Sequence, residues 1–201
     1  KLKNEIVLFD SGNGDSIEQI FANMKGWGLD PTSISHCFLT HPHFDHAGGA
    51  RRLREMGVRI VAHSHCAEAV ESGDERTCPY LYHRAFPRCE VDIVLRDEDR
   101  LSVEGMAIDV LHTPGHAEGS VVYSFEWRNR KISVTGDLVA ESGSLGWEGS
   151  IDFDRVKYIH SLKQALKLHP DMILPGHRRA ALSRGFIWIE QAINKAIIQW
   201  K

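Results

Sequence analysis

Thr40-His41-Pro42-His43-Phe44-Asp45-His46 is the stretch of sequence from which both the fold and the chemistry of this chain can be argued. It places three imidazoles and one carboxylate within six consecutive positions. A hydrophobic core has no use for so many polar groups, whereas imidazole and carboxylate are the groups that bind divalent metal ions. The spacing therefore predicts a metal site, and the alternative is a surface loop that happens to be rich in histidine.

The flanking residues place this stretch between a strand and a helix. Residues 34–39 have the character of a short buried strand, and residues 50–56, which follow two glycines, have that of a helix. Open α/β sheets place their chemistry at the carboxyl ends of strands. We expect His41 and His43 to converge on one ion, with Asp45 and His46 pointing to a neighbouring one.

The bulk composition is that of an ordinary globular protein. The 201 residues fit a single domain, 1–201, and 42% of them are hydrophobic while 25% are charged. A net charge of −3 attracts neither nucleic acid nor an anionic membrane, so we expect no such partner. The sequence has no apolar run long enough for a membrane span and no signal-peptide core in residues 1–10, which predicts a cytoplasmic location.

The four cysteines at positions 37, 66, 78 and 89 show no CxxC spacing. A core of this size needs no disulfide framework, so we expect free thiols. A bridge between Cys78 and Cys89 is the alternative in an oxidising compartment.

Upstream of the metal motif, the pattern predicts a strand, helix, strand unit. Residues 5–9 form the strand and residues 10–14 the turn, and a helix capped by Asp15 or Ser16 then runs to Gly26. A second unit follows, because residues 58–62 have the pattern of another strand and a short helix starts at His63. These repeated units indicate a parallel or mixed sheet.

Residues 73–90 have no periodic pattern and are rich in aromatic side chains. A plain connection would be short and polar, so this segment predicts a lid or a substrate wall. The candidate substrate contacts are Tyr80, Tyr82, His83 and Phe86. His63 and His65 border the segment and are further candidates.

The second half of the chain begins as an antiparallel run of short strands. They are expected at residues 93–95, 101–103, 106–111, 121–125 and 132–135, before a helix at 155–168, a strand at 172–174 and a helix at 186–200. Three more ligand residues, His116, Asp137 and His177, each follow a strand and lie beside a glycine. Ligands at four strand ends in series indicate one site that draws on both halves of the chain. His112 either supports His116 or is an ordinary hydrogen-bonded strand residue.

At this point the sequence resembles the metallo-β-lactamase superfamily, from Glu5 to about Ala181. The resemblance implies an α/β fold, the αββα sandwich of two mixed β-sheets with helices on both outer faces. It also implies a dinuclear metal site. In the family's pattern, the first metal is held by His41, His43 and His116, the second by Asp45, His46 and His177, with Asp137 bridging and Asp10 supporting the ligands from behind. The family's first N-terminal strands have no counterpart before Lys1.

The resemblance is closest to the glyoxalase II branch, which shares the stretch Thr113-Pro114-Gly115-His116. β-Lactamases of the fold commonly carry cysteine where this chain has Asp137, and nucleases of the fold add a domain or a basic surface. Glyoxalase II carries a helical C-terminal domain that grips glutathione, and only about twenty residues follow His177 here, so we do not expect a glutathione thioester as the substrate. The resemblance therefore implies a compact hydrolase of thioesters, lactones or related small acyl compounds.

The ligand set implies the chemistry. Two divalent ions about 3.5 to 4 Å apart lower the pKa of a shared water to about 7, and Asp45 is the side chain to which we assign a catalytic role as well as a ligand role. Five imidazoles and two carboxylates suit Zn²⁺ best and also accept Fe²⁺ or Mn²⁺.

Two alternatives to the hydrolase stay open. His41, His116 and Asp137 form the two-histidine, one-carboxylate set of non-haem iron oxygenases, and persulfide dioxygenases in this superfamily hold a single iron with residues matching these three. The other alternative is a non-catalytic binding module of the same fold.

Overall fold

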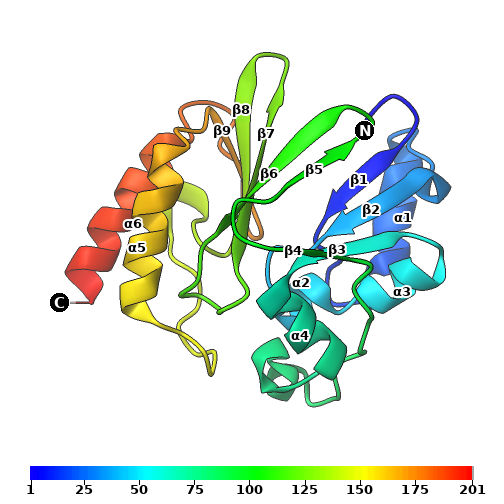
Figure 1. Cartoon of the computed structure of the whole chain (residues 1–201), viewed down its shortest axis with the longest axis horizontal. Helices are drawn as coiled ribbons and strands as arrows, with labels where there is room; N and C mark the ends of the chain where they lie inside the picture. Colours follow the sequence, from blue (N-terminus) through cyan, green and yellow to red (C-terminus); the bar gives the residue numbers. More distant parts are fainter. Residues whose placement is uncertain (201) are drawn as a thin grey trace. The chain divides into compact units, whose positions relative to one another are not determined.

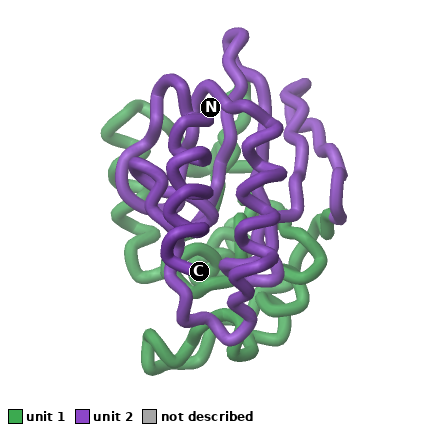
Figure 2. Tube along the Cα trace, turned by 90° about the vertical axis from the view of Figure 1, so that its left-hand side faces the viewer, with its two compact units in different colours: residues 1–95 green, residues 96–201 purple. Residues whose placement is uncertain are grey.

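The computed structural model describes residues 1–200 of the chain. The chain divides into two compact units, unit 1 over residues 1–95 and unit 2 from residue 96 onward (Figure 2). Each unit contains its own sheet and its own cluster of buried apolar side chains.

Unit 1 is built on a four-stranded sheet in the order β1-β2-β3-β4 (Figure 1). The strands are β1 (Ile6–Phe9), β2 (Ile34–Phe38), β3 (Arg59–His63) and β4 (Ile93–Leu95). The helices are α1 (Ile17–Gly26), α2 (Phe44–Ala47), α3 (Ala50–Glu55) and α4 (Ser64–Ser72), with short 3-10 helices at Pro31–Ser33, Glu75–Thr77 and Pro79–Tyr82. All three strand pairings are parallel. After each strand, a crossover that contains a helix therefore returns the chain to the end of the sheet at which the next strand begins.

The first sheet corrects two sequence predictions. It is entirely parallel over the described residues, whereas two mixed sheets were expected. Ile93–Leu95 is its fourth strand and not the start of the antiparallel run. The reason lies in Asp92, which bonds to Ile60 of β3 twice, through its backbone N–H and its side-chain carboxylate, both at 2.9 Å.

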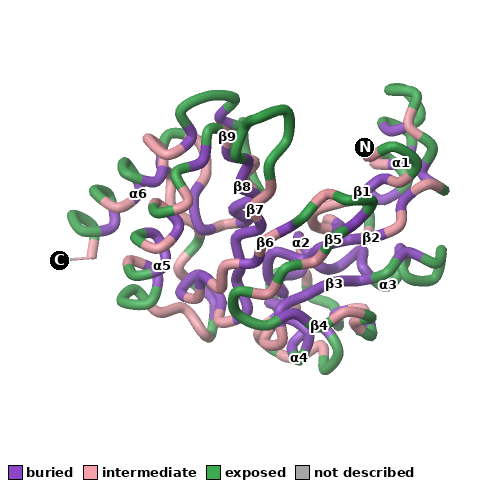
Figure 3. Tube along the Cα trace, turned by 45° about the horizontal axis from the view of Figure 1, so that its top comes forward, coloured by how far each residue is buried: buried purple, intermediate pink, exposed green. Residues whose placement is uncertain are grey.

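The core of unit 1 lies between the sheet and its helices. Phe21 of α1, Leu53 of α3 and Val70 of α4 pack in one cluster with Ile60 and Ala62 of β3. Figure 3 shows β2 and β3 as mostly buried segments, while the outward turns of the helices are exposed. Burial of these apolar side chains is the main stabilising contribution of the unit.

All four cysteines are buried free thiols in unit 1, as their spacing predicts. Burial raises the pKa of the Cys66 thiol well above its usual range and that of Cys89 to about 11. These two thiols are therefore protonated at neutral pH and act as small apolar side chains.

Unit 2 is built on a five-stranded mixed sheet in the order β5-β6-β7-β8-β9. The strands are β5 (Arg100–Val103), β6 (Met106–His112), β7 (Val121–Trp127), β8 (Arg130–Gly136) and β9 (Met172–Pro175). The first four pair antiparallel, and tight turns in which Glu104, Gly105, Arg128 and Asn129 have positive φ join β5 to β6 and β7 to β8. β9 pairs parallel to β8 after the crossover helix α5 (Arg155–Lys167).

Helices α5 and α6 (Phe186–Gln199) lie side by side on one face of this second sheet (Figure 1). Tyr158 and Leu162 of α5 pack in one cluster with Ile189 of α6 and Ile173 of β9. None of the helices among residues 1–200 is long and apolar enough to cross a membrane.

Candidate metal centre

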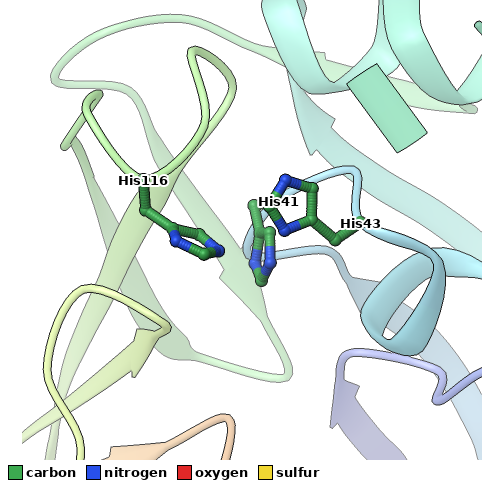
Figure 4. Close-up of side chains that lie close together, drawn as sticks. All are labelled: His41, His43 and His116. Carbon is green, nitrogen blue, oxygen red and sulfur yellow. The ribbon is translucent and has the colours of Figure 1, made fainter. Parts of the chain in front are cut away.

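Three histidines of unit 1 gather on the segment that follows β2. His41 and His43 lie on the loop (Figure 4), and His46 lies on α2, the short helix that replaces the expected turn. The ring centroid of His41 is 4.6 Å from that of His43 and 4.0 Å from that of His46. All three side chains are buried. The structure thus brings together the three imidazoles that the motif predicts.

Asp10 supports two of these histidines, His46 directly and His41 through Thr40. It follows β1, and its carboxylate accepts hydrogen bonds from the Thr40 backbone N–H at 2.7 Å, the Thr40 hydroxyl at 2.8 Å and His46 Nδ1 at 2.8 Å. The Thr40 oxygen in turn lies 3.0 Å from His41 Nδ1. Since the Thr40 hydroxyl hydrogen points to Asp10, its oxygen accepts from His41. Both imidazoles therefore carry their proton on Nδ1.

The turn after β1 is clamped against α2. Ser11 donates from both its backbone N–H and its hydroxyl to the His46 carbonyl oxygen, at 2.7 and 2.8 Å. A Cβ on Gly48 would lie 2.5 Å from the Phe44 carbonyl oxygen, and a Cβ on Gly49 would lie 2.3 Å from that of Ser11. The two glycines after the motif are therefore needed for this close approach of backbone segments.

Asp45 lies next to His46 with the spacing expected of two ligands. Its Oδ2 is 3.6 Å from His46 Nε2, which is too long for a strong hydrogen bond. Two atoms that each lie about 2.1 Å from a tetrahedral zinc ion are about 3.4 Å apart. The pair is therefore arranged as two ligands of one ion would be.

Unit 2 brings its three predicted ligands together around Asp137. The Oδ2 atom of Asp137 lies 3.6 Å from His116 Nε2 and 3.4 Å from His177 Nε2. His116 is buried, whereas His177 is about half exposed. A carboxylate between two imidazoles is the arrangement that a bridging ligand requires.

Strand direction explains this convergence. β6, β8 and β9 run the same way, so their carboxyl ends, which precede His116, Asp137 and His177, meet at one edge of the sheet. The β8–β9 register is irregular between Val134 and Gly136, and the Gly176 N–H donates to the Gly136 carbonyl at 2.9 Å. Bulges of this kind commonly re-aim a side chain beside a functional site.

His116 has its own anchor. Its Nδ1 donates to the Trp147 carbonyl oxygen at 3.0 Å, and a carbonyl oxygen can only accept. The lone pair of His116 is therefore on Nε2, as in His41 and His46. Ligating histidines characteristically donate their other ring N–H to a carboxylate, carbonyl or hydroxyl, so the donors of this chain fit a divalent metal ion.

Residues 73–90, the aromatic segment, match their prediction as a substrate wall only in part. Phe86 is a member of the unit 1 core and packs edge-on against Phe44 at 5.3 Å, and Tyr82 stacks on Phe44 at 4.4 Å. Burial raises the pKa of Tyr82, and the negative charge of Asp45 adds to this shift. Tyr80 and His83 are exposed. Phe86 as a substrate contact is therefore corrected to a packing residue, because its ring is buried.

The remaining histidines have hydrogen-bond or stacking partners of their own. His112, at the end of β6, lies 2.7 Å through Nε2 from the Glu118 carbonyl oxygen and 3.5 Å through Nδ1 from Asp97. It is thus a bonded strand residue, the second of the two predicted roles. The rings of His63 and His65 lie 5.4 Å apart at the start of α4.

Sequence analysis missed four residues that position the candidate ligands: Ser11, Thr40, Trp147 and Tyr158. Ser11 and Thr40 adjoin Asp10 and His41, so their neighbourhood was a usable signal. Trp147 acts through its backbone carbonyl, which no residue pattern reveals. Tyr158 has the spacing of an ordinary apolar residue on α5.

Comparison with known proteins agrees with this geometry. The model of the metallo-beta-lactamase superfamily matches residues 2–177. Acyl-coenzyme A thioesterase MBLAC2 from Bos taurus is 27% identical over 159 residues, which cover 69% of this chain and 54% of that protein. A hydroxyacylglutathione hydrolase from Pseudomonas putida is 28% identical over 142 residues, covering 70% of this chain and 45% of that protein. The chain spans about half the length of the curated relatives it matches.

Solved structures show the same fold. The native FEZ-1 metallo-beta-lactamase from Legionella gormanii matches with a TM-score of 0.82 over 100% of this chain and 87% of that chain, at 19% identity. This likeness confirms the predicted α/β architecture of two sheets with helices. Because the family model matches residues 2–177, well over half of the sequence, the chain belongs to the metallo-beta-lactamase superfamily.

Proposed function

We propose that this protein is a dinuclear metal-dependent hydrolase of thioesters or related acyl compounds such as lactones. The observation that carries the proposal is the filled ligand set, since every position of the family's dinuclear pattern holds a histidine or an aspartate. A binding module without catalytic activity would not require all seven of these ligand positions to be filled.

The ligands divide into two sets. In the family's pattern, one ion would be held by His41, His43 and His116, and the other by Asp45, His46 and His177. The Oδ2 atom of Asp137 lies between the Nε2 atoms of His116 and His177, and Asp137 would be the ligand shared by the two ions. We expect Zn²⁺, with Fe²⁺ or Mn²⁺ as substitutes, because imidazole and carboxylate are ligands that all three accept.

When bound, a pair of divalent ions supplies a hydroxide at neutral pH and polarises the substrate carbonyl. The protein's own groups prepare the site for this. Asp10, Thr40 and the Trp147 carbonyl fix the tautomers of His46, His41 and His116, so each presents Nε2. Asp45 adds a negative charge beside His46 and is our candidate for moving the proton of the attacking water.

Thioesters are the substrate class that the relatives favour. An acyl-coenzyme A thioesterase and a hydroxyacylglutathione hydrolase are both named for thioester cleavage. Each matches this chain at under 30% identity, so we take only the substrate class from them. We expect a small-molecule acyl substrate and neither nucleic acid nor membrane as a partner.

The test is hydrolysis of a panel of thioesters, lactones and β-lactams by the metal-loaded protein. We expect thioesters to be hydrolysed fastest, at equal rates in air and under nitrogen, with loss of activity on chelation. Oxygen uptake with glutathione persulfide, together with one iron per chain, would instead identify the dioxygenase. No turnover across the panel by a protein holding two metals would favour a binding module.

A further inference from the structure

Tyr158 is a buried side chain of unit 2 whose hydroxyl has three backbone partners, two of them beside candidate ligands. It is fully buried on α5, and its ring packs against Trp200 at 5.2 Å and Phe153 at 6.0 Å. Its hydroxyl accepts from the Gly146 backbone N–H at 2.8 Å and lies 2.8 Å from the Asp137 carbonyl oxygen and 2.7 Å from that of Leu138. A hydroxyl has one hydrogen, so Tyr158 shares it between the two carbonyls.

The hydroxyl thereby bonds to two segments, one that contains a candidate ligand and one that supports another. One is the end of β8, where Asp137 lies. The other is the loop of residues 146–150, which we name the anchor loop, whose Trp147 carbonyl fixes His116 Nδ1. Ser150 of the same loop donates from its hydroxyl to the His116 carbonyl at 2.7 Å.

Gly146 of the anchor loop packs closely against the segments that carry Asp137 and His116. A Cβ on Gly146 would lie 2.4 Å from the Asp137 carbonyl oxygen and 2.8 Å from His116 Nδ1. A Cβ on Gly115, the residue before His116, would lie 2.3 Å from the Tyr158 backbone nitrogen. Interiors packed this tightly transmit displacements, so a shift of Tyr158 would reach both ligands.

We propose that Tyr158 is a positioning residue, which sets the separation of Asp137 and His116 by bonding the end of β8 to the anchor loop. This inference rests on the proposed function, in which both residues bind metal. Removing the hydroxyl takes a hydrogen-bond partner from the buried Leu138 carbonyl and from the part-buried Gly146 N–H and Asp137 carbonyl, so we expect the backbone to shift to recover partners. The ligands move with it.

The test is Tyr158→Phe, which keeps the ring in the core. Apo protein is titrated with Co²⁺ while the visible absorption, which reports coordination geometry, is recorded. We expect Co²⁺ affinity to fall by about 10- to 100-fold, with an altered spectrum and a lower kcat at unchanged KM. The matched control is Tyr123→Phe, which removes a hydroxyl from an equally buried tyrosine of β7. It should keep the wild-type affinity and spectrum.

Wild-type Co²⁺ affinity and spectrum in folded Tyr158→Phe would overturn the inference, as would an equal loss in the control. If Tyr158→Phe does not fold, Ser150→Ala decides, because it removes one of the two bonds between the anchor loop and His116 and leaves the bond of the Trp147 carbonyl to His116 Nδ1 in place. We expect it to weaken Co²⁺ binding several-fold, and unchanged binding contradicts the proposal. A wild-type protein that binds no Co²⁺ would instead refute the proposed function, so the two failures are distinguishable.

Discussion

His46 and Asp10 are 36 positions apart in the sequence, and His46 Nδ1 lies 2.8 Å from Asp10 Oδ2. Asp10 has a φ of 62°, the left-handed conformation that non-glycine residues rarely adopt. Strain of this kind persists only where the surroundings fix it, and here three hydrogen bonds to Thr40 and His46 do so. The strained backbone of Asp10 thus lowers the local stability of unit 1, and it orients His46, a candidate ligand.

Replacing Asp10 by Asn should weaken metal binding while leaving the fold intact. Asn tolerates the left-handed conformation, but it loses the charge that supports His46 and one of the acceptor sites. We expect metal affinity to fall by about 10- to 100-fold, measured by competition with a chelator. Asp15→Asn is the control, since Asp15 forms only an exposed ion pair with Arg84. Equal affinities in the two variants would mean that Asp10 does not support the site.

Replacing Gly115 by Ala should destabilise unit 2 and disturb His116. Gly115 has a φ of 131°, and the added Cβ meets the backbone of Tyr158. Gly57→Ala is matched for backbone strain, because Gly57 has a φ of 90° with nothing within 4 Å of the added Cβ. We expect Gly57→Ala to cost about 1 to 2 kcal/mol of unfolding free energy in urea. Gly115→Ala should cost at least ~1 to 3 kcal/mol more, and equal losses would show that the clash relaxes freely.

Replacing Phe86 by Ala should act on stability rather than on substrate binding. The ring is buried in the core of unit 1, so its removal should lower the unfolding free energy by about 3 to 5 kcal/mol. Tyr80→Ala, at an exposed position of the same segment, should change stability by about 1 kcal/mol or less and raise KM. Urea denaturation and KM measurements on both variants check this. A raised KM without loss of stability in Phe86→Ala would restore the substrate-wall interpretation of that residue.

Acid should destabilise the protein partly through His36. Burial lowers the pKa of His36 from 6.5, the positive charge of Arg59 lowers it further, and Glu5 opposes the shift. The unfolded chain therefore binds a proton that the folded chain resists, so stability is full above about pH 6.5 and falls as the pH drops toward the lowered value. Urea denaturation at about pH 7.5 and about pH 5.5 should show a smaller acid loss in His36→Gln than in the wild type. An identical loss in both would assign the acid sensitivity to other groups.

Much of this architecture is predictable because its signals are local. β1, α1, β2 and α3 begin and end within a few residues of their expected positions, since apolar spacing and glycine or proline punctuation mark them. The candidate ligand residues can be found in the sequence because polar groups directly after buried strands are unusual.

What sequence analysis could not supply depends on contacts between distant residues. The placement of Ile93–Leu95 in the first sheet follows from the bonds of Asp92 to Ile60. The core position of Phe86 follows from its packing on Phe44, and the role of Trp147 follows from a backbone carbonyl. None of these contacts leaves a periodic or compositional mark in the sequence.

The central claim is most directly tested by counting metal ions in the purified protein and in Asp137→Ala. We predict about two equivalents of divalent metal per chain in the wild type. In Asp137→Ala we predict about one, with turnover reduced by orders of magnitude, because this carboxylate is the ligand proposed to be shared by both ions. Fewer than one equivalent in the wild type, or unchanged metal content and rate in the variant, would contradict the dinuclear hydrolase.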